Sequence, residues 1–135
     1  MAAWRVMSES ATPHKPPPKR ILVVDDEPLV ADTIKMMLSG MGHIVEIANN
    51  AENALRAFEV GKYDLVTTDL QMPGMGGLEL ARLLKTLCKT QPIILISGSI
   101  HEARLKRVQL DAIDGVVCKP FTLVELANAV ARAMA

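Results

Sequence analysis

Short apolar runs alternate along the chain with longer segments in which apolar residues recur every three or four positions. The apolar runs predict five strands, at residues 21–24, 44–48, 64–70, 92–97 and 115–118. The periodic segments predict five helices, of which the fourth, residues 102–110, is the most polar. Strict alternation of strands and helices favours right-handed crossovers, and therefore an α/β fold with a parallel sheet between two helical layers.

Capping residues mark where three of these helices begin. The sequence Asp-Asp-Glu-Pro at residues 25–28 is typical of a strand that turns into a helix, and Asn50 can cap the second helix. Thr122 and Glu125 have the spacing of a capping box at the start of the last helix. The apolar positions assigned to the first, third and last helices are Leu29, Val30, Ile34, Met37, Leu38, Met41, Leu78, Leu80, Leu83, Leu84, Leu87, Val124, Leu126, Ala127 and Val130.

The first 18 residues differ in composition from the rest of the chain, which has the length of a single domain. Residues 1–18 are rich in Ser, Thr and Pro, and three successive prolines at 16–18 favour an extended conformation, so we expect a flexible arm. Trp4 then lies outside the core. Residues 19–135 have a common length for one domain.

Charge and cysteine content exclude several classes of partner. Fifteen basic and fifteen acidic residues give a formal charge of zero, which predicts no binding to nucleic acid or to an anionic membrane. No apolar run approaches the roughly 20 residues that span a bilayer. Two cysteines, Cys88 and Cys118, lie in apolar contexts and indicate a reducing, cytoplasmic location. The three histidines, His14, His43 and His101, are expected to be exposed loop residues.

Polar residues follow the predicted strands at their carboxyl ends. In a five-stranded doubly wound sheet of the common order 2-1-3-4-5, these ends meet beside strand 1. The residues brought together there are Asp25, Asp26, Asp69, Ser97 and Lys119. Any single aspartate could be a helix cap or turn residue, but three neighbouring carboxylates repel one another unless one protonates or a cation binds. Oxygen ligands without His or Cys favour Mg²⁺.

Four motifs carry a resemblance to the receiver domains of two-component response regulators, which are flavodoxin-like α/β domains. They are residues 21–28 (ILVVDDEP), 69–77 (DLQMPGMGG), 94–98 (ILISG) and 119–121 (KPF), and the resemblance covers residues 19–135. It implies that Asp69 is the phosphoacceptor and that Mg²⁺ is bound by Asp26, Asp69 and the backbone carbonyl of Gln71, with Asp25 helping through water. It also implies that Ser97 and Lys119 contact the phosphoryl group and that the Lys119–Pro120 peptide is cis.

The same resemblance implies a signalling switch or phosphorelay protein, not an enzyme that turns over a separate substrate. A histidine kinase or a histidine phosphotransfer protein would be the donor, and Asp69 would slowly dephosphorylate itself. A degenerate receiver that only binds proteins is the alternative. An aspartate-nucleophile phosphohydrolase is a further one, but such enzymes resemble a pattern with a second Asp two residues after the nucleophile, where this chain has Gln71.

One departure affects the predicted output. Many receivers carry an aromatic residue three positions before the lysine, whereas this chain has Val116. We therefore expect the signal to pass through Ser97 and Gly98 to the fourth helix. A downstream protein would bind the face made by the fourth helix, the fifth strand and the fifth helix, with Arg104 and Val116 near it. The chain is either a stand-alone receiver or part of a longer regulator or hybrid kinase.

Overall fold

Five parallel strands form the centre of the molecule. The computed structural model describes residues 17–98 and 107–135, without the side chains of 107–109. The strands are β1 (Arg20–Val24), β2 (Ile44–Ala48), β3 (Leu65–Thr68), β4 (Ile93–Ser97) and β5 (Gly115–Cys118). Their order is β2-β1-β3-β4-β5, and every neighbouring pair is parallel. The predicted sheet and its strand order are confirmed.

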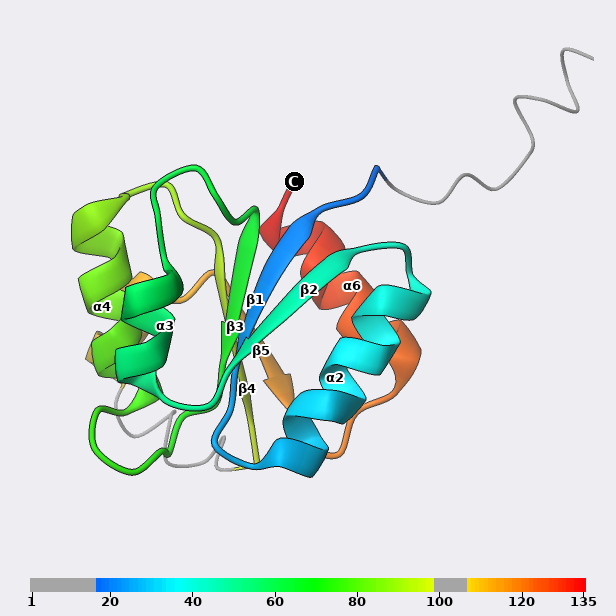
Figure 1. Ribbon diagram of the computed structural model, residues 1–135, viewed down its shortest axis with the longest axis horizontal. Helices are drawn as coiled ribbons and strands as arrows, with labels where there is room; N and C mark the ends of the chain where they lie inside the picture. The colour runs from blue at the N-terminus through cyan, green and yellow to red at the C-terminus, as the bar shows by residue number, and fades with distance from the viewer. Residues whose placement is uncertain (1–16, 99–106) are drawn as a thin grey trace, which may run out of the picture.

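Helices cover both faces of this sheet (Figure 1). Helices α3 (Ala51–Ala57) and α4 (Gly77–Leu87) lie on one face, and α2 (Pro28–Gly40) and α6 (Leu123–Ala133) lie on the other. Four of the five predicted helices are therefore confirmed. Most of the fourth predicted helix, 102–110, lies outside the described residues.

The described end of that fourth segment differs from the prediction. Residues Arg107–Ala112 form a 3-10 helix, and the Ile113 N–H donates to the Leu110 carbonyl at 2.9 Å. Leu110 and Ile113 pack against the buried side chains of Leu70, Leu78 and Leu95. These contacts with α4 and the sheet hold the segment as a short 3-10 helix. The polar sequence here has little of the apolar periodicity that a regular α-helix would need.

Strand residues alternate between two hydrophobic layers. Ile21 and Val23 of β1 are buried with α2 and α6, whereas Leu22 and Val24 are buried with α3 and α4. All four side chains are almost completely inaccessible. Burial on both faces explains why the strand sequence is continuously apolar and does not alternate with polar residues.

The predicted caps of two helices are confirmed. The Asn50 side chain accepts a hydrogen bond from the Asn53 N–H at 2.7 Å, and Thr122 and Glu125 form a reciprocal capping box at 3.1 Å in each direction. Helix α2 begins differently. Its N-cap residue, Glu27, makes no side-chain cap, and Pro28 occupies the first turn, where no backbone donor is needed.

His43 is buried, contrary to the prediction of an exposed loop. Its Nδ1 accepts a hydrogen bond from the Lys19 N–H at 3.2 Å. Burial is the main cause that lowers the pKa of His43, the Lys19 charge lowers it further, and Asp64 opposes them. The turn that joins α2 to β2 is covered by the chain leading into β1, a contact that local sequence does not reveal. His14 and His101 lie outside the described residues.

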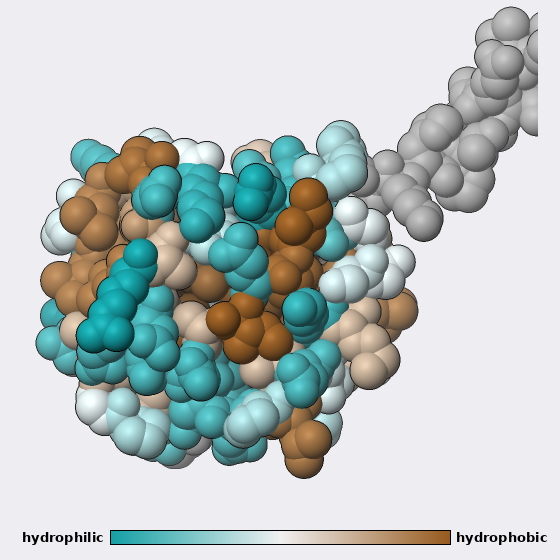
Figure 2. All heavy atoms as spheres, viewed as in Figure 1, coloured by the Kyte–Doolittle hydropathy of each residue, from teal (hydrophilic) through white to brown (hydrophobic). Residues whose placement is uncertain are grey.

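Several of the apolar side chains that marked the predicted helices are exposed. Leu29 is 82% exposed, and Leu83, Leu87 and Val124 are exposed as well. Cys118 is also exposed, and Cys88 is partly buried. On the side viewed in Figure 2, hydrophobic side chains form several separate groups within a mainly hydrophilic surface.

A hydroxyl group is buried in the layer beneath α2 and α6. Thr67 of β3 pairs in register with Val23 and Ile94, and its Oγ1 has no hydrogen-bond partner among the residues that the structure describes. A buried hydroxyl without a partner costs free energy of folding.

Within the described residues, no helix is both long enough and apolar enough to cross a membrane.

Candidate functional site

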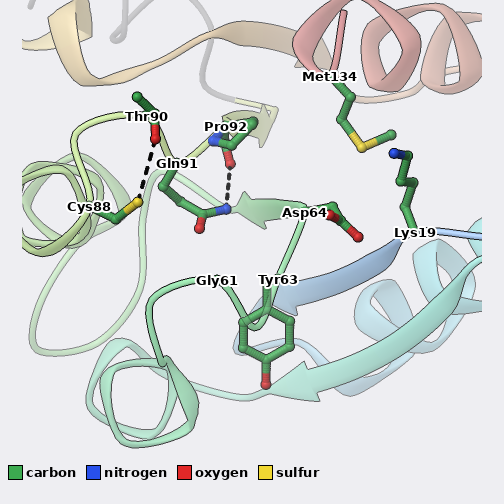
Figure 3. Close-up of a pocket in the computed structure, with 9 residues that line it drawn as sticks. All are labelled: Lys19, Gly61, Tyr63, Asp64, Cys88, Thr90, Gln91, Pro92 and Met134. Atoms are coloured by element: carbon green, nitrogen blue, oxygen red, sulfur yellow. Dashed lines mark hydrogen bonds between the residues drawn. The ribbon is translucent and has the colours of Figure 1, made fainter.

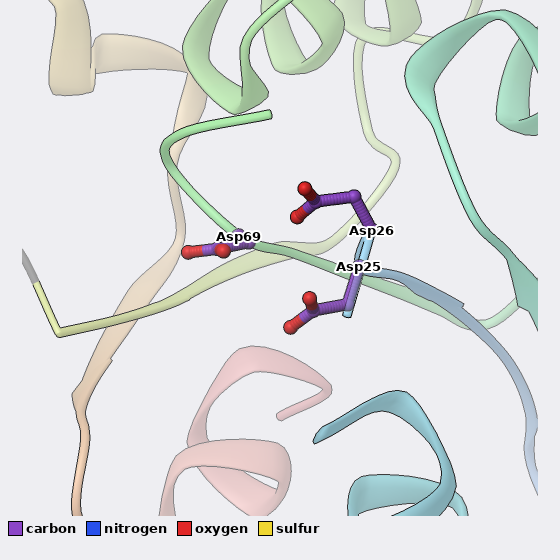
Figure 4. A group of neighbouring side chains, drawn as sticks. All are labelled: Asp25, Asp26 and Asp69. Atoms are coloured by element: carbon purple, nitrogen blue, oxygen red, sulfur yellow. The ribbon is translucent and has the colours of Figure 1, made fainter. Parts of the chain in front are cut away.

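Three aspartates meet where β1 and β3 end. Asp25 and Asp26 directly follow β1, and Asp69 directly follows β3. One carboxylate oxygen from each lies within 4.8 Å of the others, and Figure 4 shows the three side chains gathered at this edge. Asp25 and Asp69 are buried, whereas Asp26 is partly exposed. The parallel sheet thus brings together the three carboxylates that the sequence analysis selected.

Lys119 forms ion pairs with two of these carboxylates. Its Nζ lies 3.3 Å from Asp25 Oδ2 and 3.7 Å from Asp69 Oδ2, and its side chain is 21% exposed. The Lys119 N–H donates to the Ser97 carbonyl at 2.9 Å, and the following Lys119–Pro120 peptide is cis. Among the described residues, Lys119 is the cation paired with this group of three carboxylates, which leaves the described cluster with an excess of negative charge.

The environment of Asp69 reflects this excess. Burial is the largest cause that raises the pKa of Asp69, and Asp25 and Asp26 raise it further. The Lys119 charge and the hydrogen bond that Asp69 Oδ1 accepts from the Leu70 N–H at 2.8 Å act in the opposite direction without cancelling the rise. Another positive charge would therefore favour the ionised carboxylate. An all-oxygen donor set with excess negative charge fits a hard divalent cation such as Mg²⁺.

Helix α4 begins against the backbone of Asp69. The Gly77 N–H donates to the Leu70 carbonyl at 2.9 Å, and a Cβ at Gly77 would lie 1.9 Å from the Asp69 carbonyl oxygen. Only glycine allows this approach. Gly77 was not among the site residues predicted from the sequence. The adjacent pair Gly76-Gly77 before an apolar periodic segment was the available signal.

A pocket of about 240 Å³ opens beside Asp69. Asp69, Gln71, Ser97, Gly98 and Lys119, all selected from the sequence, line it together with Glu27 and Val30, which were not selected. Ser97 is buried and Gln71 is exposed. A Cβ at Gly98 would come no closer than 4.0 Å to Lys119, so the pocket has free space on that side.

Of the residues predicted to carry the output, Ser97 and Gly98 line this pocket, whereas Val116 lies apart from it. Val116 is on the edge strand β5, pairs with Leu95 and is 38% exposed. A groove of about 290 Å³ runs between β5 and α6 and includes Val116, Cys118 and Arg132. Arg104 lies outside the described residues.

Sequence comparison identifies related proteins. A profile of the response regulator receiver domain matches residues 21–131. The transcriptional regulatory protein QseB of Escherichia coli O157:H7 is 34% identical over 109 residues, which are 80% of this chain and 49% of QseB. The sensor kinase/phosphatase LuxN of Vibrio campbellii is 35% identical over 103 residues, 76% of this chain and 12% of LuxN. The chain therefore spans about half or less of the length of these curated relatives.

Solved structures share the fold. The response regulator TrrA of Thermotoga maritima, crystallised with Mg²⁺ and BeF, has a TM-score of 0.79 and is 39% identical; the match covers 85% of this chain and 98% of TrrA. TrrA in complex with the histidine kinase ThkA has a TM-score of 0.78 at 38% identity, with coverage of 87% and 99%.

Proposed function

The chain belongs to the response regulator receiver domain family, and on this premise we propose that it is a signalling switch or phosphorelay protein that is phosphorylated on Asp69. The observation that carries the proposal is the contact of Lys119 with both Asp25 and Asp69 within a cluster of three carboxylates. An intact acidic and basic set argues against the degenerate alternative. We assign residues 19–135 to the receiver and residues 1–18 to a separate arm.

We propose that Asp26, Asp69 and the Gln71 carbonyl hold Mg²⁺ and that Asp25 binds it through water. The excess negative charge at Asp69 and the all-oxygen donor set support this assignment. The relative TrrA was crystallised with Mg²⁺ and BeF, which is consistent with it. When bound, the ion would neutralise charge on the phosphoryl oxygens.

The reaction requires one new bond at phosphorus. A carboxylate oxygen of Asp69 attacks the phosphoryl group as the P–N bond to the donor histidine breaks, and the imidazole keeps the electron pair and takes a proton from solvent. Lys119 Nζ and the Ser97 hydroxyl neutralise charge on the equatorial oxygens. In the separate dephosphorylation step, water attacks phosphorus, the P–O bond to Asp69 breaks, and inorganic phosphate leaves. The protein thus catalyses only its own phosphorylation and dephosphorylation.

We propose that a histidine kinase or a histidine phosphotransfer protein is the donor and that the reaction takes place in the cytoplasm. An apolar groove of about 300 Å³ next to the phosphorylation pocket supports a protein donor. It lies between the start of α2 and the β5–α6 connection, includes Leu29 and Phe121, and shares Val30 with the pocket at Asp69. The downstream partner is assigned to the β5–α6 face that contains Val116, extended by residues of the fourth predicted helix. We propose no nucleic-acid or membrane partner.

Intact-mass spectrometry with acetyl phosphate tests the phosphoacceptor. We expect the wild-type chain to gain one labile phosphoryl group with Mg²⁺ present and to gain none with EDTA. Asp69→Asn should gain none in either condition. Asp32→Asn, which changes an exposed aspartate on α2, should behave as the wild type does.

Three outcomes would contradict the proposal. Phosphorylation of Asp69→Asn at the wild-type rate would place the acceptor elsewhere. A folded wild-type chain that gains no phosphoryl group from acetyl phosphate or from a phosphorylated histidine donor would indicate a degenerate receiver. Sustained turnover of p-nitrophenyl phosphate would indicate a phosphohydrolase.

A further inference from the structure

A second apolar groove lies at the opposite end of the sheet from the aspartates. It has a volume of about 280 Å³ and is lined by Met41 at the end of α2 and by Ala127, Val130, Ala131 and Met134 of α6. In Figure 1, the end of α6 and the start of β1 lie together at the upper end, whereas β1 ends at the lower end, near the aspartates. None of these residues lines the pocket beside Asp69.

The described chain begins at residue 17, two residues before Lys19, which lines this groove. Lys19 and Met134 also border a more polar pocket of about 290 Å³, and Figure 3 shows their side chains close to one another at one side of that pocket. The sixteen residues before residue 17 are therefore attached at the edge of the groove.

The length and sequence of this leader suit the groove. Three of its four large apolar side chains, Trp4, Val6 and Met7, are grouped within four positions. Fifteen positions separate Trp4 from Lys19, and a flexible chain of that length has a root-mean-square span of about 20 Å. Such a tether keeps the two groups at an effective concentration on the order of millimolar, without the entropic cost of bringing two molecules together.

We propose that the groove between Met41 and α6 is the docking site of the chain's own residues 4–7, with the Trp4 ring placed over Ala131 and Met134. An indole ring supplies a large apolar contact area at a low cost in side-chain entropy. Docking there would hold the leader against α6, the helix that also borders the proposed output face.

Trp4 is the chain's single tryptophan and therefore reports its own environment. In the full chain, we expect its fluorescence to be blue-shifted relative to the urea-unfolded chain, with acrylamide quenching reduced several-fold. Because the contact is intramolecular, both values should stay constant over a hundredfold dilution. If the protection of Trp4 from acrylamide disappears on dilution, the proposal is wrong, because Trp4 would then be covered by a second copy of the chain.

Two matched lysine variants on α6 locate the contact. Ala131→Lys puts a charge into the groove at an exposed position, and Asn128→Lys adds the same charge at an exposed position that borders the β5 groove instead. We expect Ala131→Lys to return Trp4 emission and quenching to the values of the unfolded chain, and Asn128→Lys to leave them unchanged. Far-UV circular dichroism checks that both variants are folded.

Methyl NMR detects the same contact through the methionine methyl groups that line the groove. Trp4→Ala should remove ring-current shifts from the Met41 and Met134 methyl groups and leave the Met72 methyl group, which packs beside α4, unmoved. The proposal is wrong if native Trp4 is as accessible as in the unfolded chain. It is also wrong if Ala131→Lys leaves Trp4 protected or if the two methionine signals do not respond to Trp4→Ala.

Discussion

The α-carbon of Gly77 faces the backbone carbonyl of Asp69 so closely that a Cβ would come to 1.9 Å from the oxygen. The first residue of α4 is thus packed directly against the residue proposed to accept phosphate. Because the obstacle is backbone, it cannot rotate away as a side chain would. The position of α4 and the position of the Asp69 backbone are therefore mechanically coupled.

Gly77→Ala should both destabilise the protein and slow its phosphorylation. The added methyl group must displace the Asp69 backbone or the start of α4, which we expect to cost about 2 kcal/mol or more. Urea unfolding and the rate of phosphorylation by acetyl phosphate measure the two effects. Gly40→Ala is the control, since a Cβ there meets nothing within 4 Å and should leave both values nearly unchanged. Equal behaviour of the two variants would contradict the close approach.

Asp69→Asn should be more stable than the wild type in EDTA at neutral pH. A carboxyl group whose pKa is raised on folding stabilises the folded state only at low pH, and this contribution is lost as pH rises through the folded pKa. At neutral pH, ionised Asp69 is therefore a cost that the amide removes. Urea midpoints in EDTA and in Mg²⁺ test this. The advantage should shrink in Mg²⁺, and an Asn variant less stable than wild type in EDTA would refute the argument.

His43 should make the protein less stable on mild acidification. Its pKa in the folded protein is below the ordinary value of 6.5, so the unfolded chain binds the proton more readily. Stability is complete above that value and falls as pH drops from 6.5 toward the folded pKa. His43→Asn keeps an acceptor for the Lys19 N–H but does not titrate, so its urea midpoint should fall less between pH 7.5 and pH 5.5. Parallel decreases would exclude His43 as the source.

Two neighbouring threonines on β3 should respond oppositely to valine. Thr67 Oγ1 has no hydrogen-bond partner within residues 17–98 and 107–135, so Thr67→Val removes a buried unsatisfied group and should stabilise the protein by about 1 kcal/mol. The equally buried Thr68 donates to the Asp69 carbonyl at 2.9 Å, and Thr68→Val should destabilise it by a similar amount. Urea unfolding of the two single variants is the measurement. A loss of stability in Thr67→Val would show that its hydroxyl is satisfied in solution.

Replacing Gln71 should lengthen the lifetime of the phosphorylated protein. Gln71 lines the pocket beside Asp69, and its amide can orient the water that attacks phosphorus. Gln71→Leu and Gln71→Met cannot form that hydrogen bond and cover the same space with apolar atoms. Loss of the phosphoryl mass after removal of acetyl phosphate gives the decay rate. Wild-type decay in both variants would remove Gln71 from the mechanism.

The sheet order, the caps at Asn50 and Thr122 and the meeting of the three aspartates could be predicted because each depends on a local pattern plus one topological rule. The burial of His43 and the contact of Gly77 with Asp69 could not. Both are made by segments distant in the sequence, and the residue types alone are ordinary for loops. For Leu29 the local prediction was right and the packing was not predictable. It lies in α2 as its periodicity predicted, but no neighbouring element of the described chain covers its side chain.

The contact between Lys119 and Asp25 joins residues that are 94 positions apart. During synthesis from the N-terminus, Asp25 and Asp69 are made well before the strand that delivers Lys119. A chain interrupted before β5 has carboxylates without their lysine and lacks a partner for the β4 edge. If Asp69 accepts a phosphoryl group as proposed and needs Lys119 to do so, phosphorylation also requires that the last strand has docked. A copy without that strand would then lack a complete phosphorylation site.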